Sequence, residues 1–169
     1  LEIAHLEGFN RSAQDVTLAR LLQFGIAPAL KQNFEEIQRA PYIIRLLLAE
    51  LDHDCNPTFF RINYDGHWET FKSGTVIAGN EKVMDWIQQE IQNLPFATFT
   101  LDKALEEVCR LWVESKKQQE EEKDFPQTLK EAFDQWVLEG AVLLGKVERR
   151  AIYRALTKEE IEKLKSSVG

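Results

Sequence analysis

The first long run of spaced apolar residues follows a helix-start signature. Ser12-Ala-Gln-Asp15 places a carboxylate three residues after a hydroxyl side chain, which is the pattern of a helix N-cap. Apolar side chains then recur with helical spacing over Val16–Ile37. The pattern predicts a largely buried helix that runs to about Gln38, with a kink near Gly25 and Pro28.

The clearest strand pattern begins at Pro41. Residues Tyr42–Leu51 are apolar at nearly every position instead of at alternate positions, which predicts a strand covered on both faces. Thr58–Tyr64 and His67–Phe71 then predict a hairpin. The dipeptide between them, Asp65-Gly66, is typical of type I′ turns.

The rest of the chain alternates predicted helices with short strands. The predicted elements are a strand at Thr75–Ala78, helices capped by Asn80 and by Thr100, a short helix at Leu129–Trp136, strands at Leu138–Leu144 and Arg150–Leu156, and a final helix opened by the capping box Thr157–Glu160. This order predicts an α+β fold with helices stacked outside a sheet or a pair of sheets.

Composition narrows the class of protein. A chain of 169 residues that is 44% hydrophobic and 29% charged is typical of one globular domain, here 1–169. A net charge of −7 disfavours nucleic acid as a partner. The chain contains neither an apolar run long enough for a transmembrane helix nor a signal-peptide pattern at its start, so we expect no membrane contact. Two cysteines give no disulfide framework, which indicates a reducing, cytoplasmic location.

Two groups of residues have the chemistry of a site. Asp52-His53-Asp54-Cys55 contains the residue types that bind metal ions, but neighbouring side chains point apart and no second paired motif accompanies them. A polar hairpin turn over Asp52–Pro57 is therefore the favoured interpretation. Cys109 lies beside the apolar side of a predicted helix and is expected to be a small buried thiol. We predict no metal ion and no cofactor.

Several short strings occur along the chain in a characteristic order. They are Asp15-Val16-Thr17, Pro41-Tyr42, Tyr64-Asp65-Gly66, Ala78-Gly79-Asn80, Leu138-Glu139-Gly140-Ala141-Val142-Leu143, the basic strand Arg149–Arg154 and the acidic helix Lys158–Leu164. In this order they resemble the proteasome subunit family, and most closely its bacterial α-type subunits. The resemblance covers almost the whole chain, although no single string is specific by itself. It implies a sandwich of two antiparallel sheets between helix layers, the αββα fold of N-terminal-nucleophile (Ntn) hydrolases.

The chain departs from this family pattern in two places. It lacks the N-terminal portion of a full subunit, with the gate-forming helix and the first strands, and it carries an acidic insertion or extension at 115–135. Catalysis in this fold uses an N-terminal nucleophile whose own α-amino group is the base. Leu1 offers no nucleophile, and the serine of the catalytic subunits' Gly-Ser-Gly turn is absent near Ala78–Asn80. The resemblance therefore implies a non-catalytic, structural and gating α-type subunit within a threonine-type protease complex.

The resemblance also implies the partners. These are neighbouring copies in a ring, catalytic β-type subunits, an ATPase regulator and protein substrates. Leu18, Leu22 and Phe24 on the first helix are the expected interface residues, with a plain core role as the alternative for each. Two other functions stay open: a catalytic β-type or other N-terminal-nucleophile hydrolase whose nucleophile lies upstream of Leu1, and an unrelated α+β interaction module whose acidic segment Glu120–Asp124 recruits a basic partner.

Overall fold

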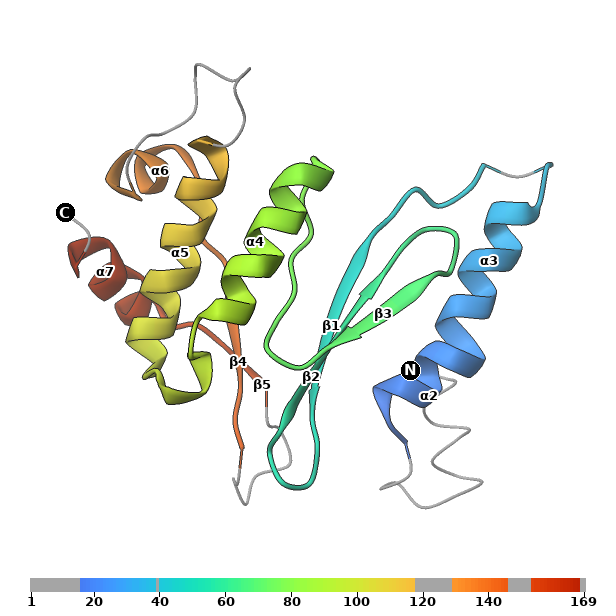
Figure 1. The fold of residues 1–169 in the computed structure, drawn as a ribbon, viewed down its shortest axis with the longest axis horizontal. Coiled ribbons are helices and arrows are strands. Elements are labelled where there is room, and N and C mark those ends of the chain that lie inside the picture. Colours follow the sequence, from blue (N-terminus) through green and yellow to red (C-terminus); the bar gives the residue numbers. More distant parts are fainter. Residues whose placement is uncertain (1–15, 39, 118–128, 146–152, 168–169) are drawn as a thin grey trace. The chain divides into compact units, whose positions relative to one another are not determined.

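The computed structural model describes residues 16–38, 40–117, 129–145 and 153–167. It is an α+β structure of helices and small antiparallel sheets, as predicted (Figure 1). The chain divides into two compact units, Leu1–Ile77 and Ala78–Gly169, and each is described by itself. The single domain over 1–169 stays a prediction. None of the described helices has the length and apolar character needed to cross a membrane.

The first unit opens with a helix that contains a wide turn. Helix α2 (Leu18–Leu21) continues through the π-helical turn η2 (Leu22–Ile26) into α3 (Ala27–Glu35). The Ala27 N–H donates to the Leu22 carbonyl, five residues back. Pro28 has no N–H to donate to the carbonyl of Phe24, so the wider turn is the local response of the helix to this proline. The helix is thus irregular where a kink was predicted, near Gly25 and Pro28.

The predicted C-terminal end of this helix is wrong. The helix begins at Leu18, with the Thr17 hydroxyl accepting a hydrogen bond from the Arg20 N–H at 3.3 Å, and the predicted cap residues Ser12–Asp15 lie outside the described residues. It ends at Glu35 instead of about Gln38. Ile37 is consequently 99% exposed, because it follows the last helical turn and does not lie on the buried side of a helix.

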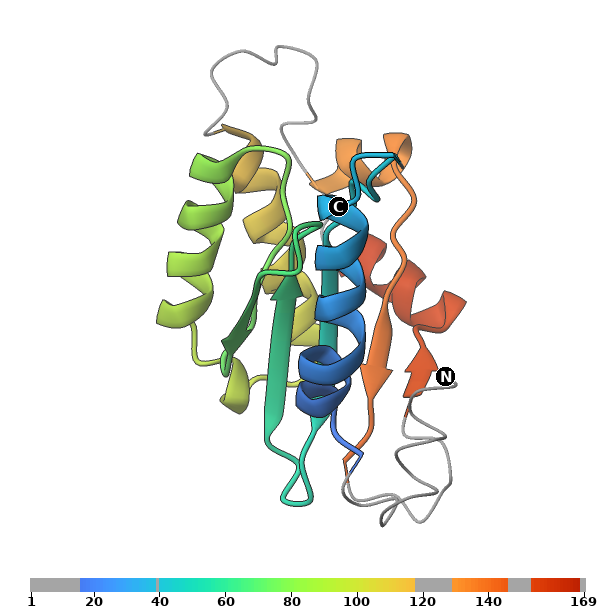
Figure 2. The ribbon, with the colours of Figure 1, turned by 90° about the vertical axis from the view of Figure 1, so that its right-hand side faces the viewer.

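A three-stranded antiparallel sheet follows, in the order β1-β2-β3. Strand β1 (Leu46–Leu51) pairs with β2 (Pro57–Ile62), which pairs with β3 (Trp68–Phe71). The helix lies against one face of this sheet (Figure 2). The core between them comprises Leu22, Leu30, Phe60 and Ile62, surrounded by Leu18, Ala19, Ile26, Leu46, Leu48 and Trp68.

The predicted strand Tyr42–Leu51 is wrong in its start and in its burial. Residues before Leu46 are not in a strand, because the Ile44 N–H donates to the Tyr42 carbonyl and closes a three-residue turn. No residue of β1 is fully buried, and Leu47 is 42% exposed. The sequence predicted a strand whose two faces are both covered. In the described sheet, β1 is instead a partly exposed strand at the edge.

The β2–β3 hairpin is confirmed, but its type I′ turn is wrong. A type I′ turn needs positive φ at both central residues, and only Gly66 of this pair has it, at +81°. The Gly66 N–H donates to the Asn63 carbonyl, and the Asn63 N–H donates to the His67 carbonyl. The loop therefore has three residues and ends in a left-handed glycine, which is the next most common hairpin connection.

The second unit is mostly helical. Its elements are α4 (Glu81–Asn93), the 3-10 turn η3 (Phe96–Thr98), α5 (Leu101–Lys117), α6 (Leu129–Gln135), β4 (Ala141–Leu143), β5 (Tyr153–Ala155) and α7 (Lys158–Ser167). Helix α5 contacts α4, α6 and α7, and β4 pairs with β5 in an antiparallel arrangement. The strands are shorter than predicted, although residues 150–152 lie outside the described residues. No strand forms at Thr75–Ala78, so the strand predicted there is wrong.

The predicted helix caps of this unit are confirmed. The Asn80 side chain accepts from the Lys82 N–H at 2.9 Å, and the Thr100 hydroxyl accepts from the Lys103 N–H at 3.3 Å. At α7 the Thr157 hydroxyl accepts from the Glu160 N–H, while the Glu160 carboxylate accepts from the Thr157 N–H. Each bond satisfies a backbone donor that a helix start leaves free. Of the predicted insertion 115–135, residues 118–128 lie outside the described residues; residues 115–117 belong to α5 and residues 129–135 to α6.

Candidate protein-interaction site

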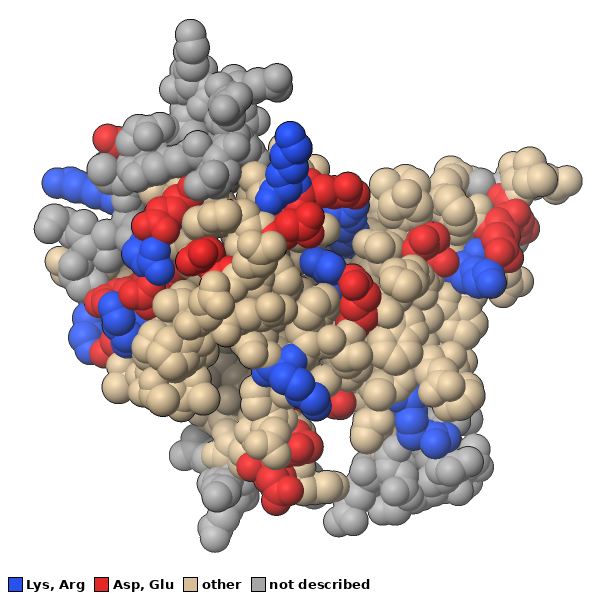
Figure 3. Space-filling view, in the orientation of Figure 1, with Lys and Arg blue, Asp and Glu red and all other residues tan. Residues whose placement is uncertain are grey.

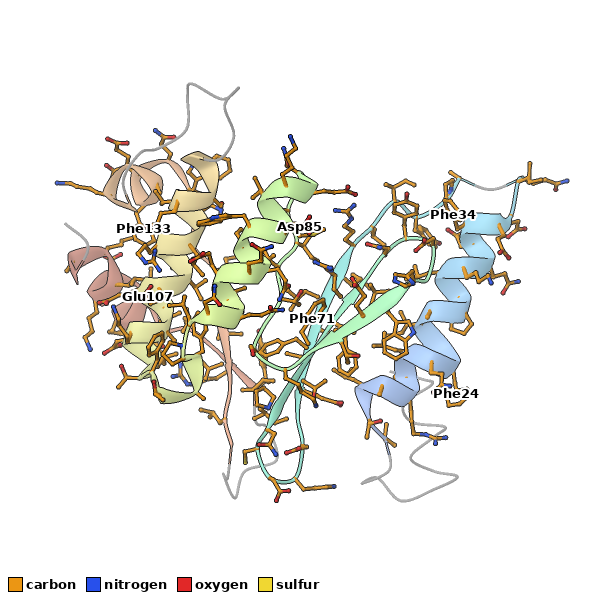
Figure 4. All side chains as sticks on the ribbon, viewed as in Figure 1. Phe24, Phe34, Phe71, Asp85, Glu107 and Phe133 are labelled. Atoms are coloured by element: carbon orange, nitrogen blue, oxygen red, sulfur yellow. The ribbon has the colours of Figure 1, made fainter. Side chains whose placement is uncertain are left out.

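The three predicted interface residues have different surroundings. Leu22 is fully buried and belongs to the core between helix and sheet, so it is not available to a partner. Leu18 is half-buried and packs against the same core. Phe24 is 61% exposed, and Figure 4 shows it on the side of the helix away from the sheet. Of the three, only Phe24 offers a large apolar surface to another molecule.

The spacing of apolar residues explains this difference. Leu18, Leu22, Ile26 and Leu30 recur every four residues, and together they form the row that faces the sheet. Two residues of a helix turn by about 200°, so Phe24 lies almost opposite Leu22. The sequence therefore contained the signal that separates Phe24 from the core row.

Phe24 has a cationic neighbour. The guanidinium carbon of Arg20 lies 5.4 Å from the centre of the Phe24 ring, which is a cation–π geometry. Aromatic and arginine side chains are both enriched in the centres of protein interfaces. Arg20 was not among the predicted interface residues, although its spacing of four residues from Phe24 is the spacing of helical neighbours. We call Arg20 and Phe24 together the Phe24 site.

The start of the helix holds this site in place. The Glu50 carboxylate of β1 accepts a hydrogen bond from the Leu18 N–H at 2.7 Å, beside the cap made by Thr17. A carboxylate is favoured there because the N-terminal end of a helix carries partial positive charge. The Phe24 site thus lies on a helix whose first turn is fixed to the sheet.

The residues with metal-ligand chemistry form a turn, as favoured. The Asp52 carboxylate accepts from the backbone N–H of Asp54 and from both the backbone and the side-chain N–H of Asn56. The hydrogen bonds from Asn56 lower the pKa of Asp52. Within the described residues, no three His, Cys, Asp or Glu side chains come together as a metal site.

Cys109 is the buried thiol that the sequence predicted. It is 7% exposed on α5, and burial raises the pKa of the thiol. A raised pKa keeps the group protonated near neutral pH, whereas the thiolate is the nucleophilic form. Cys109 is therefore a packing residue.

Several charged side chains of the second unit form ion pairs. On α5, Glu107 lies 2.8 Å from Lys103 and 2.7 Å from Arg110, and these two cations lower the pKa of Glu107. Lys163 of α7 pairs with Asp102 of α5. Figure 3 shows acidic and basic side chains interspersed on the face drawn there. Mixed charge of this kind does not form the basic stripe typical of a nucleic-acid interface.

Comparison with known proteins adds no relative. No model of a protein family matches the chain, and no curated protein matches it significantly.

Proposed function

We propose that the chain is a non-catalytic α-type subunit of a bacterial-type proteasome core, with structural and gating roles in intracellular protein degradation. The observation that carries the proposal is the layering of the first unit, in which a helix covers one face of an antiparallel sheet. The more specific prediction, an αββα sandwich of two sheets between helix layers, is part of the same proposal.

The second face of this sheet supports a sandwich. It carries Leu47, Ala49, Phe59 and Phe71, which the strand register places side by side. Among the residues of the three described strands, Arg61 is the one cation on this face, and its side chain is only 12% exposed. It pairs with Glu69 at 2.7 Å and lies 5.0 Å from the centre of the Phe71 ring. A face that is apolar and internally neutralised is suited to packing against another layer.

Several strings of the resemblance have structural roles that fit the proposed fold. Thr17 caps the first helix, Tyr64-Asp65-Gly66 forms the hairpin loop and Asn80 caps α4. The segment Leu138–Leu143 leads into β4, and the acidic string after Thr157 opens α7. Asp15 of the first string lies outside the described residues.

The proposed partners follow from this role. They are neighbouring copies in a ring, catalytic β-type subunits, an ATPase regulator and unfolded protein substrates, in the cytoplasm and without a cofactor. We assign the contact with another subunit to the Phe24 site, because it combines an exposed aromatic ring with an arginine on a fixed helix.

Native mass spectrometry and negative-stain electron microscopy of the full-length gene product test the proposal. We expect a ring of several hundred kilodaltons, and we expect Phe24→Glu to reduce its assembly by placing a charge in the contact. Gln23→Glu is the matched control, because it adds the same charge at the neighbouring exposed position. A wild-type particle that stays a monomer or dimer contradicts the proposal. So does an N-terminal threonine with peptidase activity in the mature protein, which indicates a catalytic subunit instead.

A further inference from the structure

The loop between β2 and β3 contains the only Asp-Gly dipeptide of the chain, Asp65-Gly66, and the sequence has no Asn-Gly dipeptide. In such a pair the backbone nitrogen of the glycine can attack the carboxyl group of the residue before it, because glycine has no side chain to block a close approach. Asp65 is exposed, and its carboxylate accepts a hydrogen bond from the His67 N–H at 2.9 Å. This bond turns the carboxyl group back over the Gly66 peptide, which contains the nitrogen that would attack it.

We propose that Asp65 is a modification site at which the chain isomerises spontaneously to isoaspartate. The Gly66 nitrogen attacks Cγ of the carboxylic acid form of Asp65. The new N–Cγ bond closes a succinimide ring, and the acid hydroxyl leaves with the proton of the nitrogen as water. Water then opens the ring at one of its carbonyl carbons. Opening at Cγ restores aspartate, whereas opening at the main-chain carbonyl gives isoaspartate, whose main chain runs through Cβ and Cγ. The reaction returns the water that it releases, so it needs no oxidant and no other co-reactant.

The folded loop restrains this reaction. The Gly66 N–H donates to the Asn63 carbonyl at 3.0 Å, which engages the proton that the nitrogen must lose. Gly66 also lies against α3, where a Cβ on it would be 2.5 Å from the carbonyl oxygen of Ala27. In the same loop, the Tyr64 ring lies 5.2 Å from the Phe34 ring of α3. Ring closure has to turn the peptide that precedes the glycine, so the loop must first open away from the helix.

Isoaspartate changes the loop after the reaction. It lengthens by one backbone atom a loop of three residues that is closed by the hydrogen bond from the Asn63 N–H to the His67 carbonyl. Because a Cβ on Gly66 would already meet helix backbone, the longer loop must lie farther from α3. The product therefore marks chains in which this loop has once opened. The reaction takes place between neighbouring residues, so it needs no partner and does not depend on the proposed ring.

Asp52 gives a matched comparison in the same unit. Its carboxylate accepts a hydrogen bond from the Asp54 N–H, two residues further along the chain, at 2.9 Å, which is the arrangement that Asp65 has with His67. The residue that follows Asp52 is His53, whose side chain hinders the approach of its own nitrogen to the carboxyl group. Faster conversion at Asp65 than at Asp52 therefore assigns the reaction to the glycine and not to the orientation of the carboxylate.

The test is incubation of the whole chain at neutral pH, in native buffer and in guanidinium chloride. A protease that cleaves before aspartate but not before isoaspartate, followed by mass spectrometry of the peptides, locates the product. We expect isoaspartate at Asp65 in both solutions, with a rate at least about tenfold lower in native buffer, which corresponds to about 1.4 kcal/mol for opening the loop. We expect Asp52 to convert far more slowly than Asp65 in guanidinium chloride.

Two variants test the restraint by α3. Phe34→Ala removes the ring contact with Tyr64, so we expect it to raise the rate in native buffer and to leave the rate in guanidinium chloride unchanged. Ile37→Ala is the control, because Ile37 is 99% exposed, and we expect it to change neither rate. The inference would be overturned by any of these results: no isoaspartate at Asp65 in guanidinium chloride, equal rates in the two solutions, conversion of Asp52 as fast as that of Asp65, or an unchanged native rate in Phe34→Ala.

Discussion

Gly66 lies where one added carbon would meet the backbone of the helix. Its φ of +81° lies in the left-handed region, and a Cβ built there would lie 2.5 Å from the carbonyl oxygen of Ala27 and 3.1 Å from the Cβ of Lys31. The first of these contacts is with helix backbone, which cannot rotate away as a side chain can. Gly66→Ala must therefore either strain the loop or move the loop away from the helix.

The cost of Gly66→Ala has two parts. A left-handed conformation costs a non-glycine residue about 1–2 kcal/mol. Inserting a methyl group into a close contact adds about 1–3 kcal/mol. We expect the free energy of unfolding to fall by about 2–5 kcal/mol, a large part of the about 5–15 kcal/mol that stabilises a typical domain. Gly66→Asn is expected to recover only the first part, because asparagine tolerates left-handed φ but still has a Cβ.

Chemical denaturation followed by circular dichroism measures this loss, and hydrogen exchange of β2 and β3 assigns it to the first unit. Gly79→Ala is the matched control. Gly79 does not have positive φ, and a Cβ there would meet no atom within 4 Å. We expect the control to change stability by less than about 0.5 kcal/mol. Equal stability of the two alanine variants would refute the reasoning.

Three further results are expected. The Arg154 guanidinium, together with the cap at α7, holds the pKa of Glu160 at about 2, below its ordinary value of 4.5. The stabilisation that Glu160 contributes is therefore complete above pH 4.5 and is lost as the pH falls toward 2. Hydrogen exchange of α7 should become faster over this pH range, and an unchanged exchange rate would contradict the pairing with Arg154. Cys55 is half-exposed and should react with iodoacetamide near neutral pH, whereas buried Cys109 should react only after denaturant is added; equal rates in the folded chain would contradict its burial. Phe60→Ala should cost about 3–5 kcal/mol in urea denaturation, while Phe24→Ala on the exposed side should cost far less.

Features that depend on a few neighbouring residues could be predicted from the sequence. The caps at Asn80, Thr100 and Thr157 are correct because each cap joins a side chain to backbone at most three residues away. The hairpin around Gly66 is correct for the same reason, although its exact turn depends on φ at Asp65, which side-chain chemistry constrains only weakly.

Features that depend on distant parts of the chain were less predictable. The run Tyr42–Leu51 is apolar throughout, but composition does not reveal that a turn at Ile44 delays the strand to Leu46. The exposure of Phe24 was within reach, because its distance from the row of Leu22 follows from helical spacing alone. The position of Arg20 over its ring required the structure.

The hydrogen bond from the Leu18 N–H to the Glu50 carboxylate joins the first turn of α2 to the C-terminal part of strand β1. The two residues are 32 positions apart in the sequence. Neither end can open without leaving a backbone donor or a carboxylate without its partner. The first turn of the helix and strand β1 should therefore be lost together when the first unit unfolds.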